Sequence, residues 1–521
     1  MKLPHLLASI LLASTVTGPG PVRAANYYWD ATPDGGTTLN YGSGVISTSA
    51  ANWWPASGAA YVGWTNSLTD SINIGSAGSV NGKTYESGAG VPAFTLTLDG
   101  AISAQQVLMS GALNSGNPVT ISDGGNAANT LTLANSGNVG NNSATSVLII
   151  DAQIQGGGAN GIGKINGGTV VFLKDNTYAG ATMISGQVGA GNGGVLQIGN
   201  GGTTGSLGTG AVQFALNGAQ TEASTLRFYR SDALTVNNAM SILSANGVGG
   251  IVQHAGGDTL TLGGNVVLGT TGAAVSAVLT YDIADTAQVV DTQVTGNISG
   301  IGGVAKTGAG RLIFSGSNSY TGETRIHAGT LVVNGFNGNS AFTVNGSGEL
   351  AGVGTVGALT VQGGGVLTPG DGAGILRSGA FSLASGGTLA VSLSGDTVSP
   401  VAGIDYTQLS ATGAVSLTGD FSLTLEAGYV HHEGALYFVL ENDSSDAISG
   451  AFNGLADNAI LTVDGYDFRI SYFGDSATNS FTGGNDVVLM AVPEPSGLLL
   501  GTMALGWVVV RRWSRRWFPE S

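Results

Sequence analysis

Cysteine is absent from this 521-residue sequence, and charged residues make up only 9% of it. Without cysteine the chain can form neither disulfide bonds nor thiolate metal sites. Disordered chains of this length are usually rich in charge and poor in apolar residues, whereas 42% of these residues are apolar. The composition therefore excludes a disulfide-stapled scaffold and indicates a folded protein with an extensive core.

Positive charge is scarce as well. Six of the 16 lysines and arginines lie in the two terminal segments, and the body between them carries 10 basic and 31 acidic residues, a net charge of about −21. A surface of this sign repels the phosphates of nucleic acids and the head groups of anionic lipids. We therefore expect no nucleic-acid partner.

Glycine, with 89 residues, is abundant. It separates short runs in which apolar and polar residues alternate, for example Thr130-Leu131-Thr132-Leu133 and Thr259-Leu260-Thr261-Leu262. This period of two predicts β-strands joined by glycine-rich turns. Because strands this short cannot bury a face alone, they need neighbouring coils above and below. We expect an all-β protein folded as a right-handed parallel β-helix, or β-solenoid, with roughly 20 residues per coil.

Residues 303–335 show this pattern most clearly, and an earlier copy of it lies at 161–186. The copies share a lysine, a glycine, an asparagine and a tyrosine at a constant offset of 142 positions. In the earlier copy, Leu173-Lys174-Asp175 replaces the glycine that follows the strand in the later one. The matching pairs are Lys164 and Lys306, Gly168 and Gly310, Asn176 and Asn318, and Tyr178 and Tyr320.

The two copies resemble the autotransporter-associated β-strand repeat, also called the passenger-associated transport repeat. Residues 350–395 resemble the closing module of such passengers, including its Pro369-Gly370-Asp371 turn. The resemblance implies a stacked β-fold and a role as a surface protein. It implies no reaction, and we expect no cofactor.

The first 25 residues have the pattern of an export signal. A basic Lys2 precedes a largely apolar run from Leu6 to Ala13, and a Gly-Pro break follows before the small residues Ala24 and Ala25. This order predicts a secretory signal peptide that is cleaved near Ala24 or Ala25. The expected partners are the Sec translocon and signal peptidase.

The C-terminal segment, residues 492–516, is patterned in three parts: a proline-glutamate-proline motif, a largely apolar run at 497–510, and an arginine cluster. Fourteen such residues are marginal for a full membrane span, and the arginines would stay on the cytoplasmic side. The order resembles the PEP-CTERM sorting signal, which implies a single transmembrane helix and processing by an exosortase. A permanent tail anchor is the alternative. The motif residues are Val492, Pro493, Glu494, Pro495, Arg511, Arg512, Arg515 and Arg516.

The body divides into an aromatic-rich β cap at 26–100, a solenoid at 101–395 and a C-terminal β region at 396–491. Four of the seven tryptophans lie in the cap. Aromatic rings beside amides and carboxylates can stack on sugars, but the terminal unit of a solenoid also needs atypical residues that close its core. We favour capping over carbohydrate binding for these four residues, Trp29, Trp53, Trp54 and Trp64.

Catalytic patterns are weak. Asp282, Asp285 and Asp291 form the densest acidic group, with no basic residue nearer than Lys306. His431-His432-Glu433 would place adjacent side chains on opposite faces of a strand, which is poor metal geometry, and a turn is the better interpretation. We expect no enzyme activity.

We expect a structural or adhesive protein, anchored transiently in the inner membrane and then sorted to the cell surface or extracellular matrix. Two alternatives remain at this point. One is a surface protein that binds extracellular polysaccharide, and the other is a β-helix enzyme that degrades polysaccharide.

Overall fold

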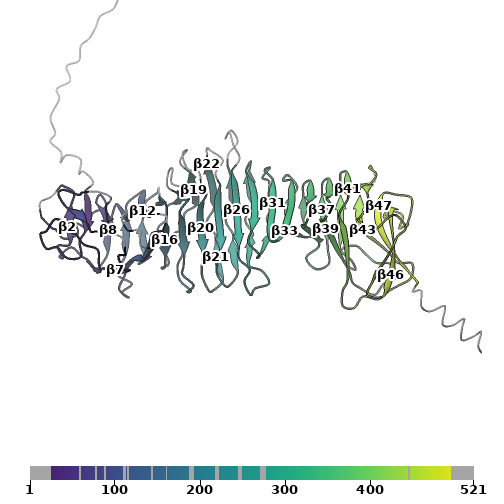
Figure 1. The fold of residues 1–521 in the computed structure, drawn as a ribbon, viewed down its shortest axis with the longest axis horizontal. Helices are drawn as coiled ribbons and strands as arrows, with labels where there is room; N and C mark the ends of the chain where they lie inside the picture. The colour runs from purple at the N-terminus through teal and green to yellow at the C-terminus, as the bar shows by residue number, and fades with distance from the viewer. Residues whose placement is uncertain are drawn as a thin grey trace, which may run out of the picture.

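The computed structural model describes residues 25–493 apart from 58–59, 77–78, 87–89, 110–112, 114–115, 142, 144, 160, 187–192, 217–221, 245–248, 270–276 and 444–445. The described residues contain 47 β-strands and no helix. They form an elongated rod with β2 near one end and β46 and β47 at the other (Figure 1). The all-β prediction is confirmed. The predicted signal peptide before Ala25 and the apolar run at 497–510 lie outside the described residues.

Parallel strands stack in register along the rod, because each coil lays its strands on those of the next. The longest ladder contains β3 (Gly44–Ile46), β7 (Phe94–Leu98), β10 (Pro118–Ser122), β13 (Val147–Asp151), β16 (Thr169–Phe172), β18 (Val195–Ile198), β20 (Ser224–Phe228), β23 (Gly250–His254), β26 (Val278–Ile283), β29 (Gly303–Thr307), β31 (Thr324–Val333), β33 (Phe342–Gly352), β35 (Leu359–Val361), β38 (Phe381–Leu383), β41 (Val415–Leu417) and β44 (Ser449–Gly450).

Further ladders form the other faces. One contains β21 (Leu234–Val236), β24 (Leu260–Leu262), β27 (Thr292–Val294), β30 (Arg311–Phe314), the long strands β31 and β33, β36 (Val366–Pro369), β39 (Thr388–Leu393) and β42 (Asp420–Leu425). A short one contains β8 (Ile102–Ala104), β11 (Leu131–Leu133) and β14 (Ile154–Gly156). An eleven-stranded sheet runs through β4 (Trp53–Pro55), β1 (Asn26–Trp29), β5 (Ser71–Ile74), β9 (Gln106–Met109), β12 (Gly137–Asn141), β15 (Ile162–Ile165), β17 (Thr182–Ile184), β19 (Val212–Leu216), β22 (Met240–Ser244), β25 (Val266–Leu268) and β28 (Ile298–Gly300).

The core is one continuous apolar column, because alternate residues of successive rungs point inward. Leu96 lies opposite Ile121, which lies opposite Ile150, and all three are fully buried. Coil length varies more than the predicted value of roughly 20 residues. Beyond the cap it ranges from 17 residues, between Val344 and Val361, to 34, between Leu383 and Leu417. The additional residues lie in turns and loops, so the rungs keep their register while coil length changes.

Antiparallel strands close both ends. At the N-terminal end β4 pairs antiparallel with β1, and the two-stranded sheet of β2 (Thr38–Leu39) and β6 (Thr84–Tyr85) lies in the same cap. At the C-terminal end the last sheet is parallel from β32 to β43 and antiparallel thereafter. Its strands are β32 (Phe336–Asn337), β34 (Thr355–Val356), β37 (Ile375–Ser378), β40 (Gln408–Ala411), β43 (Leu436–Asn442), β47 (Asp486–Val492), β46 (Tyr466–Gly474) and β45 (Ile460–Val463).

Candidate functional site

The lysine of each repeat copy is buried inside the solenoid. Lys306 Nζ donates hydrogen bonds to the carbonyl oxygens of Thr307 (2.8 Å), Gly308 (2.8 Å) and Ala328 (3.1 Å). Gly308 has a φ of +72°, and a Cβ there would lie 2.2 Å from the Ile283 carbonyl oxygen, so the turn requires glycine. Burial lowers the pKa of Lys306 to about 8. The Lys306 ammonium therefore bonds to its own turn and, through Ala328, to the next coil.

Lys164 occupies the same place in the earlier copy. Its Nζ donates to the carbonyl oxygens of Asn166 and Gly167, the latter at 3.2 Å. Burial lowers the pKa of Lys164 to about 7. Lys164 therefore bonds within its own turn, whereas Lys306 also reaches Ala328 of the next coil, and both side chains are buried.

The asparagine of the repeat bonds between coils, and its tyrosine bonds to a threonine four positions later. Asn318 Oδ1 accepts from the backbone N–H of Ile298 (2.7 Å), and its Nδ2 donates to Asn337 Oδ1 (2.9 Å). The Tyr320 hydroxyl lies 2.6 Å from Thr324 Oγ1. The earlier copy repeats these contacts, with Asn176 Oδ1 2.8 Å from Ile154 N and the Tyr178 hydroxyl 2.8 Å from Thr182 Oγ1. The constant offset of 142 positions marks these polar residues in the sequence, but it does not indicate their role.

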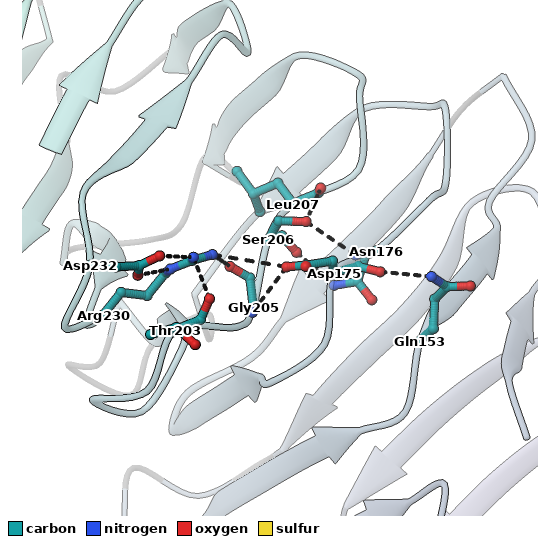
Figure 2. Close-up of polar contacts among 9 residues, drawn as sticks. All are labelled: Gln153, Asp175, Asn176, Thr203, Gly205, Ser206, Leu207, Arg230 and Asp232. Atoms are coloured by element: carbon teal, nitrogen blue, oxygen red, sulfur yellow. Dashed lines mark hydrogen bonds and ion pairs between the residues drawn. The ribbon is translucent and has the colours of Figure 1, made fainter. Parts of the chain in front are cut away.

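In the earlier copy, Leu173-Lys174-Asp175 replaces the repeat glycine, and Asp175 contributes to a polar corner centred on Arg230 (Figure 2). The guanidinium of Arg230 binds Asp232 through two bonds of 2.8 and 2.7 Å and donates to the carbonyl oxygens of Gly205 (2.8 Å) and Thr203. Asp175 Oδ1 lies 3.9 Å from Arg230 Nη1 and accepts from Gly205 N at 3.1 Å. Only 11% of the Arg230 side chain is exposed. The corner thus joins three successive coils.

The same corner continues toward the N-terminus. Asn176 Nδ2 donates to the Ser206 carbonyl oxygen (2.7 Å), and Gln153 Nε2 donates to the Asp175 carbonyl oxygen (2.9 Å), as Figure 2 shows. Next to Asp175, Lys174 Nζ lies 3.0 Å from Asp123 Oδ2 and 3.4 Å from Asp151 Oδ1. The residues that replace the repeat glycine therefore supply side-chain contacts between coils.

Replacing Arg230 with alanine should lower the free energy of unfolding by about 1.5–3 kcal/mol, because the charge-assisted hydrogen bonds from its largely buried guanidinium to Asp232 and to the carbonyl oxygens of Gly205 and Thr203 would be lost. Arg230→Lys should not restore it, since an ammonium cannot reproduce the planar fork. Urea denaturation measures the change. Arg325→Ala is the matched control, because Arg325 is half exposed and bonds only to Glu323 among the described contacts. An equal midpoint for R230A and R325A would contradict this assignment.

The cap tryptophans are packed against one another. The ring centroids of Trp29 and Trp53 are 5.3 Å apart and those of Trp53 and Trp64 are 5.1 Å apart, and all three side chains are fully buried. Trp54 is also buried and lies beneath Lys83 Nζ, at 4.7 Å. A sugar ring would have to displace core contacts to reach these faces. The arrangement therefore favours the capping interpretation.

Of the three acidic residues singled out in the sequence, Asp282 and Asp291 accept hydrogen bonds, and Asp285 is exposed. Asp291 is buried and accepts from the backbone N–H groups of Thr286 (2.9 Å) and Arg311 (2.7 Å). Asp282 accepts from Gln253 Nε2 (2.7 Å) and Thr307 Oγ1 (3.1 Å). Over the part of the chain that the structure describes, no three histidine, cysteine or acidic residues are placed to hold a metal ion.

The two adjacent histidines hold different segments together. His431 Nε2 lies 3.0 Å from the carbonyl oxygen of Val492, and His432 Nε2 lies 2.7 Å from Asp396 Oδ1. Glu433 follows at an exposed turn. Of the predicted sorting motif, Val492 ends β47, Pro493 follows it, and the other residues lie outside the described part. Ala25 is described, with its backbone N–H 3.2 Å from Asp70 Oδ1, whereas Ala24 is not.

A groove of about 390 Å³ lies on the flank of β39 and β42. Small polar and apolar residues line it, among them Thr368, Ala390 and Ser392, together with the buried Tyr406. Glu426 is its one carboxylate among the described lining residues. Glycoside hydrolysis ordinarily requires a pair of carboxylates, so this groove lacks that arrangement.

The two repeat copies match a known protein family. The model of the family described as Passenger-associated-transport-repeat matches residues 163–186 and 304–333. The chain is 43% identical over 81 residues to an extracellular serine protease of Serratia marcescens, which covers 16% of this chain and 8% of that protein. It is 40% identical over 83 residues to the adhesin BmaC autotransporter of Brucella suis biovar 1, 15% of this chain and 2% of that protein. This chain thus spans less than a tenth of either relative.

No helix within the described residues combines the length and the apolar character needed to cross a membrane.

Proposed function

We propose that this chain, which carries two passenger-associated transport repeats, is a non-enzymatic right-handed β-solenoid that acts as a structural or adhesive element at the cell surface or in the extracellular matrix. One observation carries the proposal: the lysine, asparagine and tyrosine of both repeats are buried, and Lys306 and both asparagines bond to neighbouring coils inside the stack. Because these side chains are buried, they serve the stacking of the rod. The resulting rod has a long surface with few charged residues, along which side chains can be displayed to a matrix.

Export and sorting are part of the same proposal. Residues 1–25 would direct the chain to the Sec translocon and signal peptidase. The segment at 492–516 would then anchor it transiently in the inner membrane until an exosortase processes it. The matched relatives, an extracellular serine protease and an adhesin autotransporter, support a surface location. The short coverage of the protease transfers no proteolytic activity to this chain.

Deleting the exosortase of the native host should move the protein from the surface or medium to the inner membrane. Cell fractionation followed by detection of the mature body measures this shift. Mass spectrometry of secreted protein should also find no peptide containing Arg511, Arg512, Arg515 or Arg516. An unchanged distribution would mean that the tail is a permanent anchor, and the matrix role would then be abandoned.

A further inference from the structure

The folded body ends at a defined point next to the predicted membrane segment. Val492 is the last residue of β47, where it lies opposite Asp467 of β46, and its carbonyl oxygen is 3.0 Å from His431 Nε2. Four residues, 493–496, separate it from the apolar run at 497–510. At roughly 3.3–3.6 Å per residue, this connection reaches at most about 18 Å. A bilayer that holds the apolar run therefore holds the C-terminal end of the rod close to its surface.

An exposed apolar loop projects at this same end of the rod. The loop, residues 395–405, carries Val398, Val401 and Ile404, whose exposed fractions are 70%, 52% and 68%. Single exposed apolar side chains are ordinary on protein surfaces. Three within seven residues are an apolar concentration of the kind that marks an interaction site.

The loop has a fixed base and an ordered tip. The backbone N–H of Ser394 donates to the Asp405 carbonyl oxygen at 2.6 Å, and Leu393 bridges Tyr406. At the tip the Val401 N–H donates to Asp405 Oδ2 at 2.8 Å, and the Ile404 N–H donates to the Val401 carbonyl oxygen at 3.2 Å. These bonds hold the apolar side chains outward.

Hydrogen bonds also place the loop beside the exit of the chain. His432 Nε2 is 2.7 Å from Asp396 Oδ1 at the start of the loop, while the adjacent His431 bonds to Val492. The turn that contains both histidines therefore connects the apolar loop to the last residue before the tail. A surface that contacts Val492, the last residue of β47, therefore also lies near the apolar loop.

We propose that the apolar loop is a lipid-contact site: while the tail is inserted, Val398, Val401 and Ile404 enter the boundary between head groups and acyl chains. This rests on the proposed membrane insertion of residues 497–510. Apolar side chains at such a boundary bind by burying area. The net negative charge of the body favours a neutral lipid surface over an anionic one. Of the two loop carboxylates, Asp396 bonds to His432 and Asp405 caps the Val401 N–H.

The absence of cysteine makes the test direct, because a single introduced thiol can be labelled alone. The full-length I404C variant, carrying a polarity-sensitive fluorophore, is reconstituted in phosphatidylcholine vesicles and floated on a density gradient. V289C is the matched control, since Val289 is 86% exposed and lies mid-rod, between β26 and β27. Lipids with a quencher near the head group should quench the I404C label at least twofold more than the V289C label.

Each outcome separates the two proposals. If the chain floats with the vesicles but the I404C label reports the same aqueous environment as the V289C label, the lipid-contact site is overturned. Membrane anchoring would then still stand. If the chain does not float, the insertion of residues 497–510 fails, and the lipid-contact site fails with it. Shielding of the I404C label without vesicles would instead reveal self-association through the loop and would overturn lipid contact.

Discussion

Replacing Trp53 with alanine is expected to destabilise the N-terminal cap by about 3–5 kcal/mol. The indole of Trp53 is fully buried between Trp29 and Trp64, so its removal leaves a cavity and deletes two aromatic contacts. The remaining tryptophans lie at 507, 513 and 517, outside the described residues. If the tail that contains them is removed as proposed, tryptophan emission reports the cap alone, and urea titration followed by this emission measures the change.

Leu68→Ala is the control for this experiment, because Leu68 belongs to the same cap but is 45% exposed. Hydrogen exchange adds a local readout: the amides of β1 and β4 should lose protection in W53A, while those of β33 should keep it, since each solenoid coil contacts mainly its neighbours. An unfolding midpoint equal to that of L68A would show that Trp53 does not close the core. The capping interpretation would then be wrong.

Stability should rise with pH between 6.5 and 9.5, and Lys306 should account for about 2 kcal/mol of the rise. Burial lowers the pKa of Lys306 to about 8 in the folded protein, whereas the unfolded chain holds that proton up to about pH 10.5. Between these values the unfolded state binds more protons, so raising the pH favours folding. Urea midpoints measured across this range in Lys306→Met should show a smaller rise than in the wild type.

Lys174→Met is the matched control, because Lys174 is partly exposed and ion pairs with Asp123 and Asp151 raise its pKa. This variant should keep the rise between pH 6.5 and 9.5. The range stops there because burial raises the pKa of tyrosines such as Tyr320, which lowers stability as pH approaches 10. If the urea midpoint rises equally in K306M and the wild type between pH 6.5 and 9.5, Lys306 keeps its proton throughout this range.

Strands and repeats were predictable from the sequence because they rest on local patterns. The alternation at Thr130-Leu131-Thr132-Leu133 corresponds to β11, whose two leucines are buried. The 142-residue offset identified both repeats, and their matched residues make matching hydrogen bonds. Such features depend on a period of two or on identical residues, and both can be read without knowing the fold.

Coil length and the polar corner were not predictable in the same way. The 34-residue coil between Leu383 and Leu417 is longer than the 17-residue coil mainly because of the connection at 394–407 between β39 and β40, and loop length has no periodic signal. Arg230 follows β20 and meets Asp175, 55 positions earlier, because the two residues lie two coils apart at the same corner of the stack. The role of Lys306 was hidden because a lysine in an alternating strand is usually assigned to the solvent face.

The antiparallel closure of both ends has a consequence for assembly. A stack of parallel strands exposes a row of unpaired amide and carbonyl groups at each end, which can template the addition of further chains as in cross-β fibrils. Here β4 covers β1 with reversed direction, and its outer side is bridged by Val62, while β47 reverses direction over β43. A second copy cannot continue the parallel register there. The ends of these two sheets are thus protected against the addition of a second copy in parallel register.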